Sequence, residues 1–281
     1  MKNLKKIAES IHILGSFCGK RDITELTPEA LQKAYGIKKA DLLILFGGSI
    51  PYGCDVAGAA MLAGMASRLM IVGGEGHTTE ALRQNIHNAY PTIPTKGKME
   101  AEVMSAYIQM KYGIKDCLLE CESTNCGNNV TNTLQVLEDN QIAYEHMIIM
   151  QDATMQNRMD AGFRKFLKNK CVQIINFASY QVEVTVADNE LVYAEKGNEI
   201  WGMWDINHYI TLLMGEIPRL YDGAGGYGPK GKDFIAHVEV PEKVLEAYQY
   251  LREEYGDFTR EANPLYASKK EKNAKKEKIE E

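Results

Sequence analysis

The chain has 281 residues, of which 45% are hydrophobic and 25% are charged, and its formal net charge at pH 7 is −6. These values are typical of a globular protein with a substantial core, and they exclude intrinsically disordered and collagen-like chains. The acidic balance also argues against nucleic-acid binding, which needs Lys and Arg clustered on one face. No apolar run approaches the ~20 residues of a membrane-spanning helix, so we predict a cytoplasmic protein without membrane insertion.

Two helices are predicted before the first strand. Apolar residues recur at helical spacing between Leu4 and Leu14, which favours a helix packed on the rest of the protein over a signal peptide. In "LTPEALQKAYG", Thr27 is placed as an N-cap, Pro28 lies in the first turn and Gly36 ends the helix.

Five short apolar runs follow, nearly continuous rather than alternating, as is typical of parallel strands buried on both faces. They are "ADLLILFGG" (40–48), "RLMIVGGEG" (68–76), "DCLLECES" (116–123), "HMIIMQDAT" (146–154) and "CVQIINF" (171–177). Helix-forming segments lie between them. This alternation predicts an α/β fold of the Rossmann-like, doubly wound type, with a mostly parallel five-stranded sheet and helices on both faces.

The pattern changes after the fifth run. Residues 180–197 can form strands or irregular structure, residues 199–223 are predicted as a helix that folds back on the sheet, and Pro241 opens a last helix. The final 14 residues are charged and poor in hydrophobic side chains. We therefore expect an N-terminal helical segment (1–39), a Rossmann-like core (40–180), a C-terminal helical elaboration packed on that core (181–258) and a charged, flexible tail (259–281).

Polar or glycine-rich segments follow the first four runs: "GGSIPYG", "GGEGHTT", "ESTNCGNN" and "QDATMQNR". Parallel strands bring their carboxyl ends to one edge of the sheet, where ligands bind. Glycine lets backbone N–H groups approach a ligand, and helix N-termini favour anionic groups. The candidate ligand-binding residues are Gly47, Gly48, Ser49, Gly73, Gly74, Glu75, Gly76, His77, Glu100, Ser123, Thr124, Asn125, Asn129, Asp152, Thr154 and Arg158.

Several roles are open among these residues. His77 can act as a general acid or base, or be a structural histidine of its loop. Glu75, Glu100 and Glu122 can accept hydrogen bonds from ribose hydroxyls or an amino group, although Glu100 also suits the first turn of a helix. Asn125 and Asn129 suit recognition of an adenine edge or an amide, but such loops also close their own turns.

Two further side chains have alternative readings. Arg158 can pair with Asp152 to orient the fourth loop, or it can bind a ligand carboxylate with two hydrogen bonds. Cys126 can be a nucleophile activated by a helix N-terminus, or a buried inert thiol. The six cysteines include no CxxC pair and no matching histidine spacing, so we expect free thiols and no bound metal.

Common catalytic and nucleotide-binding motifs are absent from the sequence. It contains no GxGxxG after the first strand, no GxxxxGK[ST], no GxSxG and no HExxH. A standard NAD site, a P-loop, an α/β-hydrolase elbow and a zincin site are each disfavoured.

The chain resembles the YdcF-like family of bacterial proteins, whose relatives include the envelope-associated SanA and ElyC proteins. The resemblance covers most of residues 27–250. It is carried by "ADLLILFGGSIP", "GGEGHTT", "EAEVM" (100–104), "ESTNCGNN", "QDATMQNRMDAGFRK" and "GEIPRLYDGAGGYGPKGKDFIAHVEVP" (215–241). It implies a Rossmann-type fold with an added C-terminal part, and S-adenosylmethionine as the bound cofactor, with the reaction unassigned. Asn128 stands where the family usually has Glu, so this position lacks the carboxylate.

Three functions therefore remain in competition. The first is binding of S-adenosylmethionine or a related adenosyl ligand, with or without methyl transfer. The second is hydrolysis or transfer on a phosphorylated or sugar-lipid envelope intermediate, and the third is a ligand sensor without catalysis. The expected partner is a small molecule, not a nucleic acid, and a homo-oligomer is compatible with the sequence.

Overall fold

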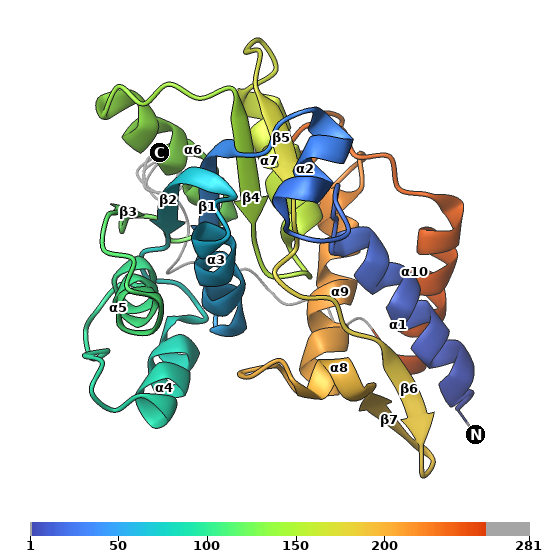
Figure 1. The fold of residues 1–281 in the computed structure, drawn as a ribbon. Helices are drawn as coiled ribbons and strands as arrows, with labels where there is room; N and C mark the ends of the chain where they lie inside the picture. Colours follow the sequence, from blue (N-terminus) through green and yellow to red (C-terminus); the bar gives the residue numbers. More distant parts are fainter. Residues whose placement is uncertain (1, 257–281) are drawn as a thin grey trace, which may run out of the picture.

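A computed structural model describes residues 2–256 of the chain. Its centre is a five-stranded, all-parallel sheet in the order β3-β2-β1-β4-β5 (Figure 1). The strands are β1 Ala40–Phe46, β2 Ala66–Val72, β3 Cys117–Glu120, β4 His146–Met150 and β5 Gln173–Asn176. Each overlaps one of the predicted apolar runs, so the predicted Rossmann-like α/β fold is confirmed.

The central strand β1 shows why the apolar runs are continuous. Leu43 pairs with Leu69 of β2 on one side and with Ile148 of β4 on the other. Leu43 packs with the helices on one face of the sheet, whereas Leu42 and its alternate neighbours pack with those on the other face. Because both faces are covered, every position of the strand favours an apolar residue.

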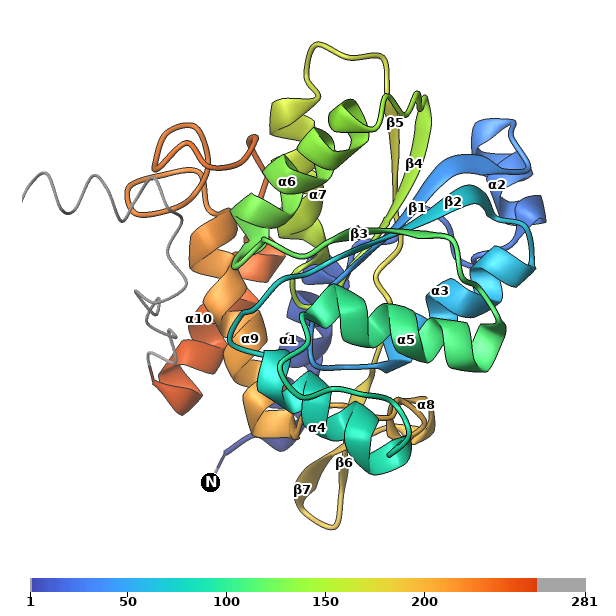
Figure 2. The ribbon, with the colours of Figure 1, turned by 90° about the vertical axis from the view of Figure 1, so that its left-hand side faces the viewer.

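Helices cover both faces of the sheet (Figure 2). One face packs against α3 Tyr52–Leu62, α4 Thr79–Ala89 and α5 Glu100–Tyr112. The other packs against α6 Cys126–Asp139 and α7 Gln156–Phe166. The short helix α2 Pro28–Tyr35 has the predicted ends: Thr27 Oγ1 accepts a hydrogen bond from Ala30 N–H at 3.2 Å, and Gly36 has a φ of +73°.

A third core forms beside the sheet. Here α1 Leu4–Cys18 packs against α9 Ile206–Leu220 and α10 Glu242–Tyr255, with its Ile7, Ile11 and Leu14 almost fully buried. The predicted N-terminal helical segment therefore shares a core with the C-terminal elaboration.

Two sequence predictions concern residues 181–205, and the structure decides both. The segment left open as strand or irregular forms an antiparallel pair, β6 Val184–Ala187 and β7 Glu190–Tyr193. A short helix, α8 Glu195–Asn198, follows. The helix predicted from residue 199 was wrong at its start, because α9 begins only at Ile206. Gly202 has a left-handed φ of +79°, and Asp205 caps α9 by accepting a hydrogen bond from His208 N–H at 3.0 Å.

The strand order fixes where a ligand site is expected. From β1 the chain continues to β2 and β3, and it then returns to β4 on the other side of β1. The connections after β1 and β4 therefore leave on opposite faces of the sheet, and the crevice between their carboxyl ends is where ligands bind in this fold.

No helix among residues 2–256 combines the length and the apolar character needed to cross a bilayer. The predicted charged tail, residues 259–281, lies outside the described residues.

Candidate functional site

The floor of the candidate site is the glycine pair that ends β1. Gly47 N–H donates to Val72 O at 2.6 Å, which extends the pairing of β1 and β2 by one residue. A Cβ atom at Gly48 would have Gln151 Oε1 as its nearest described neighbour, at 3.9 Å. At Gly48, which has no side chain, the loop after β1 therefore faces Gln151 in the loop after β4.

Glu100, the first residue of α5, lies against this floor on the β2 side. It is 7% exposed, and its Oε1 accepts hydrogen bonds from Thr79 Oγ1 at 2.7 Å and Thr78 Oγ1 at 3.2 Å. A Cβ atom at Gly47 would collide with Glu100 Oε2, and one at Gly73 would lie 3.1 Å from it. Both glycines are therefore required for the carboxylate to reach the ends of β1 and β2.

Burial raises the pKa of the Glu100 carboxyl, and the two threonine hydroxyls offset this only in part. A raised folded-state pKa contributes stability at low pH that is lost as the pH rises through it. We therefore predict that Glu100→Gln, which cannot titrate, becomes more stable relative to the wild-type protein as the pH rises from about 4 to about 8. Melting temperatures of the two proteins across this range measure the difference.

Glu102, on the same helix, provides the matched control. Its pKa is lowered by the hydrogen bond from Lys98 Nζ, so its stabilising effect is present at neutral pH and is lost as the pH falls. Glu102→Gln should therefore show the opposite trend relative to the wild-type protein. A melting-temperature difference for Glu100→Gln that does not change with pH would contradict the raised pKa.

The loop after β2 carries two predicted site residues that are exposed to solvent. Glu75 is exposed, and its carboxylate pairs with Arg83 at 3.1 Å. His77 is also exposed. Gly76 N–H donates to Thr79 Oγ1 at 2.7 Å, so this glycine fixes one of the two threonines that hold Glu100.

The end of β3 is joined to the β2 loop through backbone and hydroxyl groups. Gly74 N–H donates to both Ser123 O, at 3.1 Å, and Ser123 Oγ, at 3.2 Å. Glu120 Oε1 accepts hydrogen bonds from the N–H groups of Glu122 and Ser123, at 2.7 and 2.9 Å. Glu122 itself is exposed. Glu120, which we had not singled out in the sequence, is therefore the acidic residue that shapes this loop.

The polar segment 123–133 leads from the loop after β3 into α6, and several of its side chains bond to one another in the turn at the start of that helix. Asn125 Oδ1 accepts a hydrogen bond from Asn128 N–H at 3.0 Å, and its Nδ2 donates to Asn128 Oδ1 at 2.9 Å. Thr124 Oγ1 donates to the same oxygen at 3.2 Å. Asn129 differs from these residues: it is 9% exposed, and its side-chain amide forms no hydrogen bond with the rest of the described chain.

The loop after β4 holds the second buried carboxylate. Asp152 accepts hydrogen bonds from Thr154 N–H at 2.8 Å, Thr154 Oγ1 at 2.7 Å and Tyr180 Oη at 2.8 Å. It is 9% exposed, and burial raises the pKa of its carboxyl despite these donors. Asp152 N–H donates to Gln151 Oε1 at 2.6 Å.

Arg158 does not form an ion pair with Asp152, which was one of the two alternatives for this residue. Its Nε and Nη2 donate to Glu216 Oε2 and Oε1, at 2.6 and 2.9 Å, and Asp152 has no ion pair within the described chain. This arrangement also commits two donors of Arg158 to a protein carboxylate rather than to a ligand. The pairing with Asp152 is therefore wrong, because the partner of Arg158 comes from α9, 58 positions along the chain.

Cys126 is the first residue of α6, but its thiol is not activated. Burial raises its pKa, and the nearby positive charge of Arg158 does not reverse this direction. Its sulfur lies 3.8 Å from Met155 Sδ. The helix N-terminus therefore does not make Cys126 a reactive thiolate, and the reading as an inert thiol is the one that fits.

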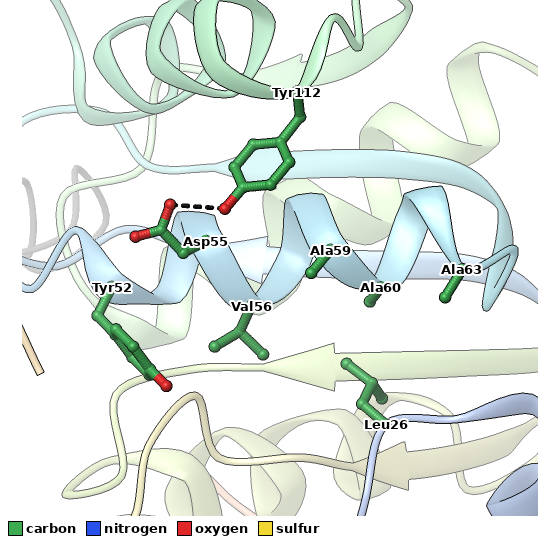
Figure 3. Close-up of a pocket in the computed structure, with 8 residues that line it drawn as sticks. All are labelled: Leu26, Tyr52, Asp55, Val56, Ala59, Ala60, Ala63 and Tyr112. Atoms are coloured by element: carbon green, nitrogen blue, oxygen red, sulfur yellow. Dashed lines mark hydrogen bonds between the residues drawn. The ribbon is translucent and has the colours of Figure 1, made fainter. Parts of the chain in front are cut away.

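A groove of about 500 Å³ runs along α3, outside the candidate site (Figure 3). Val56, Ala59, Ala60 and Ala63 line it, and Asp55 lies near one end. The Asp55 carboxylate is already occupied, because it accepts hydrogen bonds from side chains that include Tyr112 Oη at 2.8 Å. None of the predicted site residues lines this groove.

The structure thus brings Glu100, Asn129, Asp152 and Thr154 to the carboxyl edge as buried groups, and it leaves Glu75 and His77 exposed. Sequence reasoning missed Gln151 and Tyr180. Gln151 immediately precedes a predicted site residue and could have been included, whereas nothing near Tyr180 marked its contact with Asp152. No group of three or more His, Cys, Asp or Glu side chains is placed to hold a metal ion within residues 2–256. A comparison of the chain with models of known protein families finds no match.

Proposed function

We propose that this protein binds S-adenosylmethionine or a related adenosyl ligand at the carboxyl edge of its sheet. The observation that carries the proposal is the pair of buried carboxylates on either side of the Gly47–Gly48 floor. Glu100 lies against Gly47 on the β2 side, and Asp152 lies in the β4 loop that faces Gly48. The resemblance to the YdcF-like family supports the same ligand.

Each carboxylate suits one part of such a ligand. A carboxylate at the end of the second strand accepts hydrogen bonds from ribose hydroxyls in many Rossmann folds, and Glu100 reaches this position from α5. Asp152 suits the positive charges of the methionine arm, because an opposite charge stabilises the ionised form of a buried carboxyl. The amide of Asn129 can both donate to and accept from an adenine edge.

The alternative, a phosphorylated or sugar-lipid substrate, has less support in this site. A phosphate group needs nearby cations, but Arg158 is paired with Glu216 and Arg83 is paired with Glu75. Two buried carboxylates would also repel a phosphate dianion. Burial raises the pKa of the Cys126 thiol, which argues against a thiolate nucleophile at this position, so we propose binding and leave the reaction unassigned.

Calorimetry of the purified protein with S-adenosylmethionine, S-adenosylhomocysteine, nucleotides and phosphosugars tests the proposal. We expect only the adenosyl compounds to bind, and at about 100 times the Kd they should stabilise the protein by about 2.7 kcal/mol in a thermal-shift experiment. Binding of phosphosugars without adenosyl compounds would favour the alternative.

Asn129→Ala should weaken adenosyl-ligand binding by a few-fold, because one neutral hydrogen bond contributes about 0.5–1.5 kcal/mol. The matched control is Gln135→Ala on the same helix, since Gln135 is exposed and bonds only to Asp139 among the described residues. Its affinity should equal that of the wild-type protein. Wild-type affinity in Asn129→Ala would remove this residue from the site.

A further inference from the structure

Three polar side-chain atoms without a hydrogen-bond partner in the described chain come from the loop after β1, the loop after β4 and the segment before α9. They are Ser49 Oγ, Gln151 Nε2 and Trp204 Nε1, and all three are shielded from solvent. Leaving one such group unpaired costs about 1–3 kcal/mol, so native proteins seldom keep several together without a purpose. None of the hydrogen bonds described above uses these atoms.

Two of these atoms come from the loops that face each other across the crevice. Ser49 follows the Gly47–Gly48 floor and is 1% exposed, and its carbonyl oxygen accepts a hydrogen bond from Asn85 Nδ2 at 3.0 Å. Gln151 is also 1% exposed. Its Oε1 is occupied by Asp152 N–H, which fixes the amide so that Nε2 is the free donor. Gln151 directly precedes Asp152, and Ser49 directly follows Gly48, whose Cβ position lies 3.9 Å from Gln151 Oε1.

The third atom is carried by residues 199–205, the non-helical segment between α8 and α9, which we call the strap. In Figure 1 the strap extends from α8 toward the N-terminal end of α3 and then returns to α9. Trp201 Nε1 donates to Asp55 Oδ2 at 2.6 Å, and its ring lies 5.5 Å from that of Tyr107. A Cβ atom at Gly202 would lie 2.5 Å from Pro51 Cδ, so the strap is closely packed on the loop after β1.

Beyond this anchor the strap places Trp204 beside Asp152. The Trp204 ring lies 4.3 Å from that of His208, at an interplanar angle of 31°. Burial raises the pKa of the Asp152 carboxyl, and the nearby Trp204 N–H is one of the groups that partly offset this. The Trp204 N–H nevertheless does not meet the geometry of a hydrogen bond to Asp152. The strap therefore contributes a donor to the same side of the crevice as Gln151.

We propose that Ser49, Gln151 and Trp204 form a subsite for the carboxylate of the ligand's amino-acid arm, an inference that rests on the proposed function. A hydroxyl, an amide N–H and an indole N–H are donors, and a carboxylate accepts several hydrogen bonds through its two oxygens. A phosphate would bring more negative charge beside Asp152, while the cation of the adjoining helix, Arg158, is paired with Glu216. An amino acid carries an ammonium group for Asp152 next to the carboxylate, so its net charge is balanced.

Because the three donor atoms are shielded from solvent, the carboxylate reaches them only when the strap or the side chains shift. The chain has two tryptophans, and both lie on the strap. Tryptophan emission therefore reports directly on this movement. In Trp201→Phe, where Trp204 is the sole emitter, ligand binding should change the emission.

The test compares S-adenosylmethionine with its decarboxylated form, which keeps both positive charges and lacks only the carboxylate. Calorimetry should show that the wild-type protein prefers S-adenosylmethionine. Ser49→Ala and Trp204→Phe should each weaken S-adenosylmethionine binding about fivefold and leave binding of the decarboxylated form unchanged. Trp201→Phe is the matched control on the same strap, because the Trp201 N–H is already bonded to Asp55, and it should keep the wild-type preference.

Further ligands separate this inference from the proposed function. If 5′-methylthioadenosine binds but the wild-type protein does not distinguish the two S-adenosyl compounds, the subsite is overturned and the adenosyl site stands. If L-methionine binds the wild-type protein but not Ser49→Ala, and no adenosyl compound binds, the subsite stands and the proposed function fails. If none of these compounds binds, both are overturned. Unchanged S-adenosylmethionine affinity in Ser49→Ala and Trp204→Phe also overturns the subsite.

Discussion

Replacing Arg158 with Met should lower the free energy of unfolding by about 3–5 kcal/mol, because it leaves a buried carboxylate without its main partner. The Glu216 side chain is 4% exposed and receives two hydrogen bonds from the Arg158 guanidinium, at 2.6 and 2.9 Å. Arg219 Nη1 already donates to Glu216 Oε1 at 3.3 Å, so the substitution would leave Glu216 with this one cationic partner in place of two among the described residues. Urea denaturation at neutral pH measures the loss.

The double variant Arg158→Met with Glu216→Leu is the control for this prediction. Replacing both members of a buried ion pair with apolar side chains is often neutral, whereas removing one member is strongly destabilising. We therefore expect the double variant to recover most of the stability lost in Arg158→Met. An Arg158→Met protein within about 1 kcal/mol of the wild-type stability would show that Arg219 or water compensates for Glu216.

The pair also joins the sheet domain to the C-terminal elaboration. Arg158 belongs to α7, which covers one face of the sheet, and Glu216 belongs to α9, which forms the third core with α1 and α10. Loss of the ion pair should therefore destabilise both the sheet with its helices and the C-terminal elaboration.

The sheet was predictable because its signal is local. Each strand is a continuous apolar run, and Leu42 and Leu43 of β1 are buried on opposite faces, so the burial of both faces appears directly in the sequence. The position of the candidate site followed from topology alone, since parallel strands share one carboxyl edge. For this reason Glu100 and Asp152 could be included before their neighbours were known.

Side-chain pairing was less predictable, because it depends on residues distant in the chain. Arg158 pairs with Glu216 rather than with the nearer Asp152, and Asp152 is bonded to Tyr180. Asn125 caps α6, which is a local role. The sequence did not distinguish this role from ligand binding, because a polar segment is compatible with both. Nothing in the sequence marked Trp204 as a site residue, because its segment was predicted to be helical.

Asp152→Asn should weaken S-adenosylmethionine binding about tenfold or more, because a hydrogen bond or ion pair with a charged partner contributes about 1.5–3 kcal/mol. The substitution keeps an oxygen that can accept from Thr154 and Tyr180, and it removes the negative charge that faces the positively charged methionine arm. The fold should tolerate it, because burial already raises the pKa of Asp152 and so disfavours its charged form. Calorimetry of ligand binding and the melting temperature of the unliganded protein measure the two effects.

The neutral compound 5′-methylthioadenosine distinguishes an electrostatic role for Asp152 from a structural one. It retains the adenosine part of the ligand but lacks both positive charges, so its affinity should change little in Asp152→Asn. If the loop after β4 were simply distorted by the substitution, both compounds would lose affinity together. Unchanged binding of S-adenosylmethionine would show that the positive charges lie elsewhere along the edge. Glu100 would then be the remaining buried carboxylate that could face them.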